Sequence, residues 1–598
     1  MGKTETIGII LITVLLFTWM WLNTPKPIEH INTKGGNEEV KPSAPPKETT
    51  GSYASKPGSK WSNRTAESSL DTTNEAYKAF GRYFGPLAVG KEKQITITTD
   101  LYTAVISAKG ALIKEWTLKN YRTWRGQPVE LINELKGGDY SILFQSIDGK
   151  LIDTKDLYFT ADFRDGQHVT LSKGKSYTVR LMLNVGDSSQ IVKTFVFENG
   201  RYDFISDITF KRMDRFIADF EYQVTWENGL NYTEENSVDE SSFSTAYAYN
   251  GGEAVSLEAN DFNKEKRIEL SGRTDWVSQT TKYFTSAIIA RSSPGDGAYL
   301  AGTAMHAPDN GVVRSYSTAL QMRFRAIPFQ SDTFQVYIGP LDYKLLKSYG
   351  VGLEKTVGLG WQWVVRPIAE YVMLPAFEFL HSFIPNYGIV IIIFSLIIKL
   401  LLNPLTVTSM KSMRKMQALQ PLMEEIKEKY KDDPQKMNQA VMNLYKEYKI
   451  NPAGGCLPML LQLPILYALW AIFRSNIALR QADFFWWIKD LSVPDTILRL
   501  PFTLPIIGMN QISGLALLMA ITMLIQQKMT VKDPRQQFMV WFMPALFWIL
   551  FNNFPSGLNL YYFVFNLLSI GQQYVMNKKP VEEVLVRPVQ KPKGRKRN

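Results

Sequence analysis

The sequence of 598 residues contains a single cysteine, Cys456, and four histidines. One cysteine excludes an internal disulfide and any cysteine-rich zinc or iron site. Between about residues 77 and 343 only His168 and His306 occur, and we find no nucleophile elbow, glycine-rich phosphate loop or metal-ligand spacing there. The lack of these motifs predicts that the protein is not an enzyme and needs no cofactor.

Long apolar runs are missing from the middle of the chain and occur near its two ends. Residues 7–22 form 16 consecutive uncharged residues, and Trp19, Met20 and Trp21 are too large for a signal-peptidase site. We therefore expect an uncleaved transmembrane anchor at residues 1–22. Residues 23–76 contain many polar side chains and prolines, which predicts a flexible linker, because this composition buries too little apolar surface to fold.

Residues 77–345 alternate apolar and polar side chains, as in "KQITITTD" and "YTVRLMLNV". A period of two, broken at Gly, Asp and Asn, predicts many short strands. Since no helical pattern lies between them, we expect a large antiparallel sandwich. We interpret this domain as a non-catalytic binding or spacing domain.

The last third of the chain predicts membrane-spanning helices, which with the N-terminal anchor make six. The shorter runs of 14 or 15 residues reach only about 21 to 23 Å, less than the ~30 Å hydrocarbon layer, which predicts a locally thinned bilayer. Before them, residues 357–382 mix aromatic, aliphatic and charged side chains, as in a helix lying on the membrane surface or an ordinary packing helix. The five apolar runs are 388–402, 456–473, 512–525, 538–551 and 557–574.

Basic residues predict the orientation in the membrane. Residues 406–450 carry nine Lys or Arg, and the tail at 578–598 carries eight. Because such segments stay in the cytoplasm, we expect both termini there and the β domain on the outer side, in a periplasm. Within residues 406–450, two apolar seams flank Asp432-Asp433-Pro434, which predicts a helical hairpin.

Three segments in this order resemble the YidC family of membrane protein insertases: "NPAGGCLPMLLQLPILYALW", "QKMTVKDPRQQ" and "FPSGLNLYYFVFNLLSIGQQ". The resemblance implies an α+β membrane protein with six transmembrane helices. Five of them would form an insertase core at residues 383–577, and the periplasmic domain would be a β-supersandwich. It also implies the bacterial inner membrane as location and nascent membrane proteins as clients. The Sec translocon, the ribosome, the signal recognition particle pathway and membrane lipids are expected partners of a monomeric core.

Lys399 interrupts the apolar run "IIIFSLIIKLLLNPL". A cation in hydrocarbon is costly unless it faces water, protein or a partner, although Lys399 lies close enough to the end of the run to snorkel. The resemblance places it in a hydrophilic groove open to the cytoplasm and to lipid, at a position where Gram-negative relatives usually carry arginine. Other groove residues are expected to be polar side chains within the spans: Ser395, Gln462, Asn566, Ser569 and Gln573.

A positively charged groove suggests how a substrate would cross. Lys399 would attract acidic residues in the translocated flank of the substrate. Meanwhile the apolar segment of the substrate would move into the lipid along an apolar surface, here called the slide. An ion or small-solute transporter using Lys399 is the alternative, although no inverted repeat is visible. The slide is predicted to consist of Leu463, Pro464, Phe547 and Leu550. Basic residues of the tail are expected to contact the ribosome or anionic lipid: Lys591, Lys593, Arg595, Lys596 and Arg597.

Overall fold

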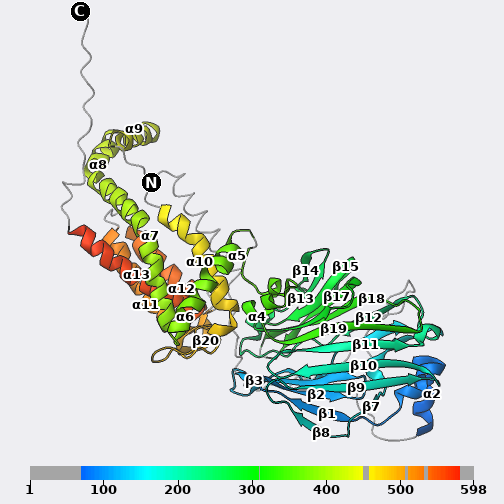
Figure 1. Ribbon diagram of the computed structural model, residues 1–598. Coiled ribbons are helices and arrows are strands. Elements are labelled where there is room, and N and C mark those ends of the chain that lie inside the picture. The colour runs from blue at the N-terminus through cyan, green and yellow to red at the C-terminus, as the bar shows by residue number, and fades with distance from the viewer. Residues whose placement is uncertain are drawn as a thin grey trace, which may run out of the picture. The chain divides into compact units, whose positions relative to one another are not determined.

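The computed structural model describes residues 69–308, 310–361, 363–448, 457–504, 509–530 and 537–578. The predicted anchor at residues 1–22, most of the predicted linker and the basic residues between Lys591 and Arg597 lie outside these ranges. The chain divides into two compact units, a β unit that ends at Gly339 and a helical unit that begins at Pro340 (Figure 1). Each unit is described separately.

The β unit contains two sheets. The smaller one has the strand order β4-β3-β2-β1-β8, and the larger one has fourteen strands. The strands of the smaller sheet are β1 (Gln94–Thr98), β2 (Tyr102–Ser107), β3 (Leu112–Arg122), β4 (Pro128–Ile132) and β8 (Gln167–Thr170). Those of the larger sheet are β5 (Ser141–Gln145), β6 (Leu151–Asp153), β7 (Thr160–Ala161), β9 (Ser176–Val185), β10 (Ser189–Glu198), β11 (Asp203–Lys211), β12 (Glu221–Trp226), β13 (Thr245–Asn250), β14 (Glu253–Leu257), β15 (Lys266–Thr280), β16 (Phe284–Ala290), β17 (Gly295–Ala307), β18 (Gly311–Arg323) and β19 (Phe329–Pro340).

The two sheets face each other across an aromatic core. The ring of Trp116 on β3 lies 6.1 Å from that of Phe204 on β11, and Tyr121 lies 5.5 Å from Phe284 on β16. The alternating pattern of the sequence therefore places one side of each strand in a shared interior. The expectation of purely antiparallel pairing is wrong at one point, because β8 runs parallel to β1. The chain from β2 to β7 connects the two strands and returns to the β1 side of the smaller sheet, where β8 runs in the same direction as β1.

Helix α2 (Ser69–Phe84) corrects the predicted linker boundary. The helix begins at Ser69, within residues that the composition assigned to the linker. Its last turn is held by aromatic contacts, with Tyr83 5.0 Å from Phe216 and Phe84 5.4 Å from Phe144 between ring centroids. The helix thus extends into the predicted linker, and its C-terminal end, beyond a break at Gly81, packs against the β unit. A second short helix in this unit is α3 (Ser237–Ser241).

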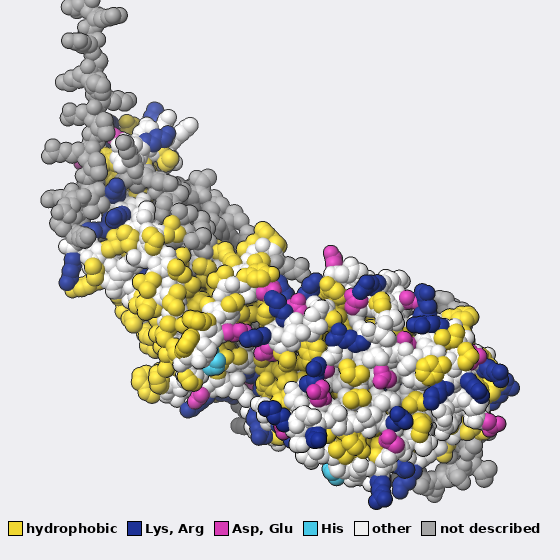
Figure 2. All heavy atoms as spheres, viewed as in Figure 1, with side chains coloured by type: hydrophobic (Ala, Val, Ile, Leu, Met, Phe, Trp, Pro, Cys, Tyr) yellow, Lys and Arg dark blue, Asp and Glu magenta, His cyan; other side chains and the backbone are white. Residues whose placement is uncertain are grey.

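The helical unit contains a bundle and a small hairpin of strands. Its first helices are α4 (Tyr343–Ser348), α5 (Val365–Ile368), a π-helical turn (Ala369–Met373) and α6 (Leu374–Phe383). They are followed by α7 (Tyr387–Ala418), α8 (Gln420–Lys429), α9 (Pro434–Glu447), α10 (Leu457–Ser475), α11 (Gly514–Thr530), α12 (Gln537–Phe551) and α13 (Ser556–Asn577). The strands β20 (Thr496–Leu504) and β21 (Met509–Ser513) pair between α10 and α11. Hydrophobic side chains cover much of the visible face of this unit (Figure 2).

Helix α7 is the one helix in the described part of the chain that is long and apolar enough to cross a membrane. Helices α11 and α12 are apolar but have only 17 and 15 residues, so the predicted count of six spans is not confirmed. The predicted start of the cytoplasmic hairpin at residue 406 is wrong, because α7 continues through Pro404 to Ala418. One proline removes a single backbone hydrogen bond, and α7 is hydrogen-bonded to α13 on both sides of it, through Lys399 before Pro404 and Arg414 after it.

The predicted hairpin consists of α8 and α9. Leu419 and Leu444 are buried where the two helices meet, and Met423 and Ile426 pack against them. The Asp433 carboxylate accepts the backbone N–H of Lys436 at 3.1 Å and so caps the start of α9. The apolar seams read from the sequence thus face each other across this turn.

The predicted amphipathic helix is shorter than expected, since α5 begins at Val365 and the described residues 357–361, 363 and 364 are not helical. Pro367 lies in the first turn of α5, where a helix tolerates proline. Phe377 packs 4.7 Å from Phe394 of α7, while Phe379 and Phe383 are exposed. The segment therefore has one apolar face against the bundle and another facing outward.

Candidate functional site

Helix α7 presents two different faces around Lys399. Leu400 and Leu401 are 63% and 68% exposed, whereas Ile398 and Lys399 are only 7% and 6% exposed. The lysine therefore points into the bundle, and the leucines beside it form the outer surface. Snorkelling toward the surface, which the sequence left open, is not the conformation observed.

The ammonium group of Lys399 is held by helix α13. Its Nζ donates a hydrogen bond to the hydroxyl oxygen of Ser569 at 2.6 Å and lies 4.7 Å from the centre of the Phe565 ring. Among the residues that the structure describes, no carboxylate forms an ion pair with it. The ammonium charge is thus stabilised by the hydroxyl oxygen of Ser569 and the face of the Phe565 ring.

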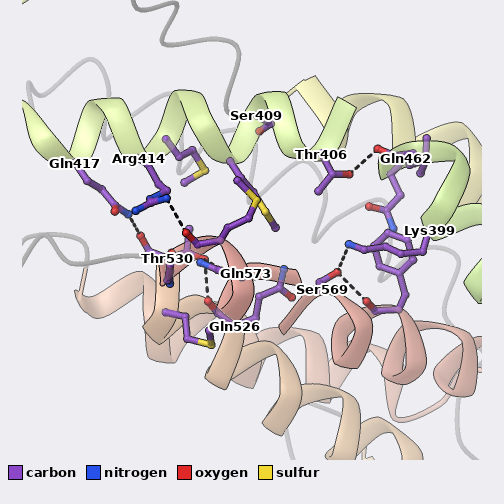
Figure 3. A pocket seen from close by; sticks show the side chains of 17 residues that line it. Lys399, Thr406, Ser409, Arg414, Gln417, Gln462, Gln526, Thr530, Ser569 and Gln573 are labelled. Atoms are coloured by element: carbon purple, nitrogen blue, oxygen red, sulfur yellow. Dashed lines mark hydrogen bonds between the residues drawn. The ribbon is translucent and has the colours of Figure 1, made fainter. Parts of the chain in front are cut away.

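A cavity of about 220 Å³ opens beside Lys399 (Figure 3). Helices α7, α10, α11 and α13 supply its walls, and none of the lining residues is acidic. A partly open cavity that combines apolar side chains with hydroxyls, amides and two cations is suited to anionic groups, because they meet donors on several sides without repulsion. The polar lining residues are Lys399, Thr406, Ser409, Arg414, Gln417, Gln462, Gln526, Thr530, Ser569, Gln573 and Asn577.

Hydrogen bonds join α7, α11 and α13 at the end of the cavity that is away from Lys399. The amide of Gln573 donates to the Thr530 hydroxyl at 2.8 Å, and Gln417 donates to the Thr530 carbonyl. Arg414 donates to the carbonyl of Met576 at 2.7 Å. The Gln417 and Arg414 bonds use carbonyls in the last turns of α11 and α13, where no amide four residues further on in the helix is available to donate. Figure 3 shows this cluster and the Lys399–Ser569 pair at opposite ends of the cavity.

Four of the predicted groove residues line this cavity: Lys399, Gln462, Ser569 and Gln573. Ser395 does not, since it is fully buried one turn earlier and donates to the Ile391 carbonyl at 2.7 Å. Asn566 is also absent from the lining, because the row of α13 that faces the cavity follows steps of four residues through Phe565, Ser569 and Gln573. The sequence had suggested a row beginning at Asn566.

The predicted slide residues are not part of the cavity wall. Leu463 and Pro464 on α10 and Phe547 on α12 are half-buried. Leu550 is 8% exposed, so it offers little surface to a passing segment. The exposed aromatic residues of α12 are instead Phe538, Trp541 and Phe542.

The sequence interpretation missed Arg414, Gln417 and Thr530. The first two lie in a segment that had been assigned to a cytoplasmic loop. A usable signal was present, since positions 399, 402, 406, 410, 413 and 417 recur at steps of three or four and mark one helical face. Extending the helix through Pro404 would have found this face.

Comparison with known proteins identifies the family. Residues 94–371 match the model described as YidC periplasmic domain, and residues 379–583 match that of the 60Kd inner membrane protein. The membrane protein insertase YidC of Chlorobaculum tepidum is 39% identical, over 98% of this chain and 96% of its own length. The chain belongs to the YidC family of membrane protein insertases. The YidC of Chloroherpeton thalassium is 36% identical, over 98% of this chain and 97% of its own.

Two solved structures show weaker likeness to this YidC family member. A crystal structure of an active YidC insertase is 20% identical and covers 86% of this chain and 98% of its own, with a TM-score of 0.35. A putative aldose 1-epimerase from Escherichia coli K12 is 8% identical and covers 42% of this chain and 99% of its own, with a TM-score of 0.25. The family assignment rests on the curated relatives and the two family models.

Proposed function

We propose that this YidC family member inserts membrane proteins by receiving their polar flanks in the cavity beside Lys399. The observation that carries the proposal is the position of Lys399, which is 6% exposed and lines a cavity to which three other helices contribute polar side chains. No observation favours small-solute transport, and the relatives named above are insertases.

The main barrier to insertion is the removal of water from the polar flank of the substrate. Transfer of a charged side chain into hydrocarbon costs several kcal/mol, whereas a cavity of amides and hydroxyls replaces part of its hydration. Lys399 would hold an acidic residue of the flank while the following apolar helix enters the lipid. Burial of that apolar helix supplies the driving force.

The arrangement in the cell forms part of the same proposal. The basic residues of α7 beyond Lys399 and of the α8–α9 hairpin face the cytoplasm, and the β unit lies in the periplasm. Nascent membrane proteins are the clients. The Sec translocon, the ribosome and the signal recognition particle pathway are proposed partners, with the tail from Lys591 to Arg597 contacting ribosomal RNA or anionic lipid.

Insertion assays with matched substrates test the role of Lys399. Two single-span substrates would differ only in whether their translocated flank carries acidic or neutral residues. Lys399→Arg should keep both activities, because the charge remains. Lys399→Ala should slow insertion of the acidic-flank substrate by about tenfold and that of the neutral one by less than about twofold. Equal loss for both substrates would contradict the proposed charge role.

A further inference from the structure

Strand β20, which pairs with β21, exposes several large apolar side chains. Ile497 and Leu498 are 50% and 53% exposed, and Phe502 is 57% exposed. The pairing with β21 is irregular between Thr496 and Leu498, and Ile497 and Leu498 are exposed side by side at this irregularity. A two-stranded hairpin is only marginally stable in water, and an uncovered apolar strand invites aggregation. This hairpin therefore needs a cover.

The hairpin is firmly mounted on the start of helix α11. Strand β21 ends at Ser513, and α11 begins at Gly514. The Asp495 carboxylate accepts the Leu515 N–H at 2.7 Å and the Trp487 indole N–H at 2.9 Å. A Cβ placed on Gly514 would lie 2.9 Å from Ile497 and 3.0 Å from Trp487, so these side chains close tightly around the glycine. These contacts join the hairpin, Trp487 and the start of α11.

Aromatic residues before the hairpin extend this surface. Trp486 is 82% exposed although its backbone has φ 58°, a conformation that bulky residues rarely adopt. Its ring stacks on Trp487 with 5.7 Å between centroids, and Phe485 is 57% exposed. The fold therefore holds a tryptophan outward at a cost in backbone strain.

We propose that this hairpin surface lies in the interfacial layer of the lipid bilayer and anchors the start of α11 there. It consists of Phe485, Trp486, Trp487, Ile497, Leu498 and Phe502. The surface continues into the exposed row of α11 formed by Leu517, Ile521 and Ile525, whose spacing of four residues marks one outward face. The proposal requires membrane embedding but does not depend on insertion activity.

The chemistry of the segment favours the interface over the hydrocarbon centre. Tryptophan concentrates at the level of lipid headgroups, and unpaired strand edges are not tolerated deeper in the bilayer. Lys489 and Arg499 are exposed in the same segment, where their side chains can reach lipid phosphates. Within the helical unit, Figure 1 shows β20 at the end opposite to α8 and α9. The cavity residues Gln526 and Thr530 lie at the other end of α11.

Spin labels measured in vesicles test this placement. The single native cysteine allows a Cys456→Ser background, into which Leu498→Cys or Phe502→Cys is introduced separately. The full chain would be reconstituted in vesicles of phosphatidylethanolamine and phosphatidylglycerol, and collisions of the nitroxide with oxygen and with a water-soluble nickel complex would be compared. Leu400→Cys on the outer face of α7 is the lipid standard, and Lys173→Cys in the β unit is the aqueous standard.

We expect labels at residues 498 and 502 to collide readily with oxygen but at least about threefold less with nickel than the label at residue 173. Nickel collisions equal to those at residue 173 at both positions would overturn the proposal, since the surface would then lie in water. Shielding from both reagents at both positions would also overturn it, because a protein partner or a second copy would then be the cover. Neither failure would affect the proposed role of Lys399.

Discussion

Lys193 of the β unit and Lys399 of the helical unit are both buried, and neither forms an ion pair with a carboxylate among the described residues, but the two are held in different ways. Lys193 on β10 is fully buried and donates to the carbonyls of Ala111 at 2.9 Å and Tyr140 at 2.7 Å. Lys399 has one hydrogen-bond acceptor, Ser569, and borders a cavity. The ammonium group of Lys193 is enclosed in a cage that includes two backbone carbonyls, whereas the cavity beside Lys399 leaves room for a group of a ligand or substrate.

The cage around Lys193 has a structural purpose. Ala111 and Tyr140 both have positive φ, 50° and 77°, so the ammonium group fastens two strained turns to β10. The ring of Tyr140 lies 4.5 Å below the same nitrogen. Two of the three donors of Lys193 are used by backbone carbonyls, and the rings of Tyr140 and Phe195 lie against the nitrogen, which leaves no room for a ligand. The comparison teaches that burial alone does not distinguish a structural lysine from a site lysine, and that the free volume beside Lys399 is what supports its proposed role.

Replacing each lysine by glutamate should give the largest difference between the two sites. Lys193→Glu would place an acid against two carbonyl oxygens, so we expect the free energy of unfolding of the β unit to fall by more than ~4 kcal/mol. Lys399→Glu should cost less than ~2 kcal/mol, because the Ser569 hydroxyl can donate to a carboxylate and the cavity can accept it. Resistance of the full chain to proteolysis during heating measures both. Similar losses of unfolding free energy in the two variants would contradict the distinction between an enclosed Lys193 and a Lys399 that borders a cavity.

The next largest effect is expected in the pH dependence of the free energy of unfolding of the β unit, to which Lys193 contributes. Burial lowers the pKa of Lys193 to about 7. Above that pH the unfolded chain binds a proton that the folded chain lacks, so the free energy of unfolding rises with pH until about 10.4. Relative to Lys193→Met, the β unit should gain about 2 kcal/mol between pH 7 and pH 9, and lose it again as the pH falls toward 7. Parallel profiles for the two proteins would contradict a buried titrating lysine.

A smaller effect is expected from the hydroxyl that holds Lys399. Ser569→Ala removes its hydrogen-bond acceptor but leaves the charge and the Phe565 ring in place. Insertion of the acidic-flank substrate should therefore slow by about two- to threefold, corresponding to about 0.5 kcal/mol. Thr522→Ala is the matched control, because Thr522 is buried, donates to its own helix and does not line the cavity. Equal effects of the two variants would mean that the Lys399–Ser569 bond has no part in insertion.

The sequence was sufficient for the features that follow local periodicity. Alternation predicted the strands of the β unit, and the apolar run around Lys399 predicted α7. The same alternation carried an unused signal, since Lys193 occupies an inward position between the buried residues Ile191 and Phe195. Its acceptors at Ala111 and Tyr140 could not be predicted, because they depend on turns distant in sequence.

The site was predictable where one helix supplied the pattern and was missed where several helices meet. Lys399, Ser569 and Gln573 follow from polar residues within apolar spans. The bonds of Arg414 to Met576 and of Gln417 to Thr530 join segments that are 162 and 113 residues apart. Such pairings depend on packing between helices, which periodicity within one segment does not specify.

Solvent access at the cavity tests the central claim most directly. In the Cys456→Ser background, Thr406→Cys lies in the cavity wall, and Thr522→Cys is a matched buried control whose native hydroxyl also donates to its own helix. With the full chain in vesicles, a small water-soluble maleimide should label residue 406 at least about tenfold faster than residue 522. Equal, slow labelling at both positions would show a dry bundle around Lys399 and would contradict the insertion mechanism proposed above.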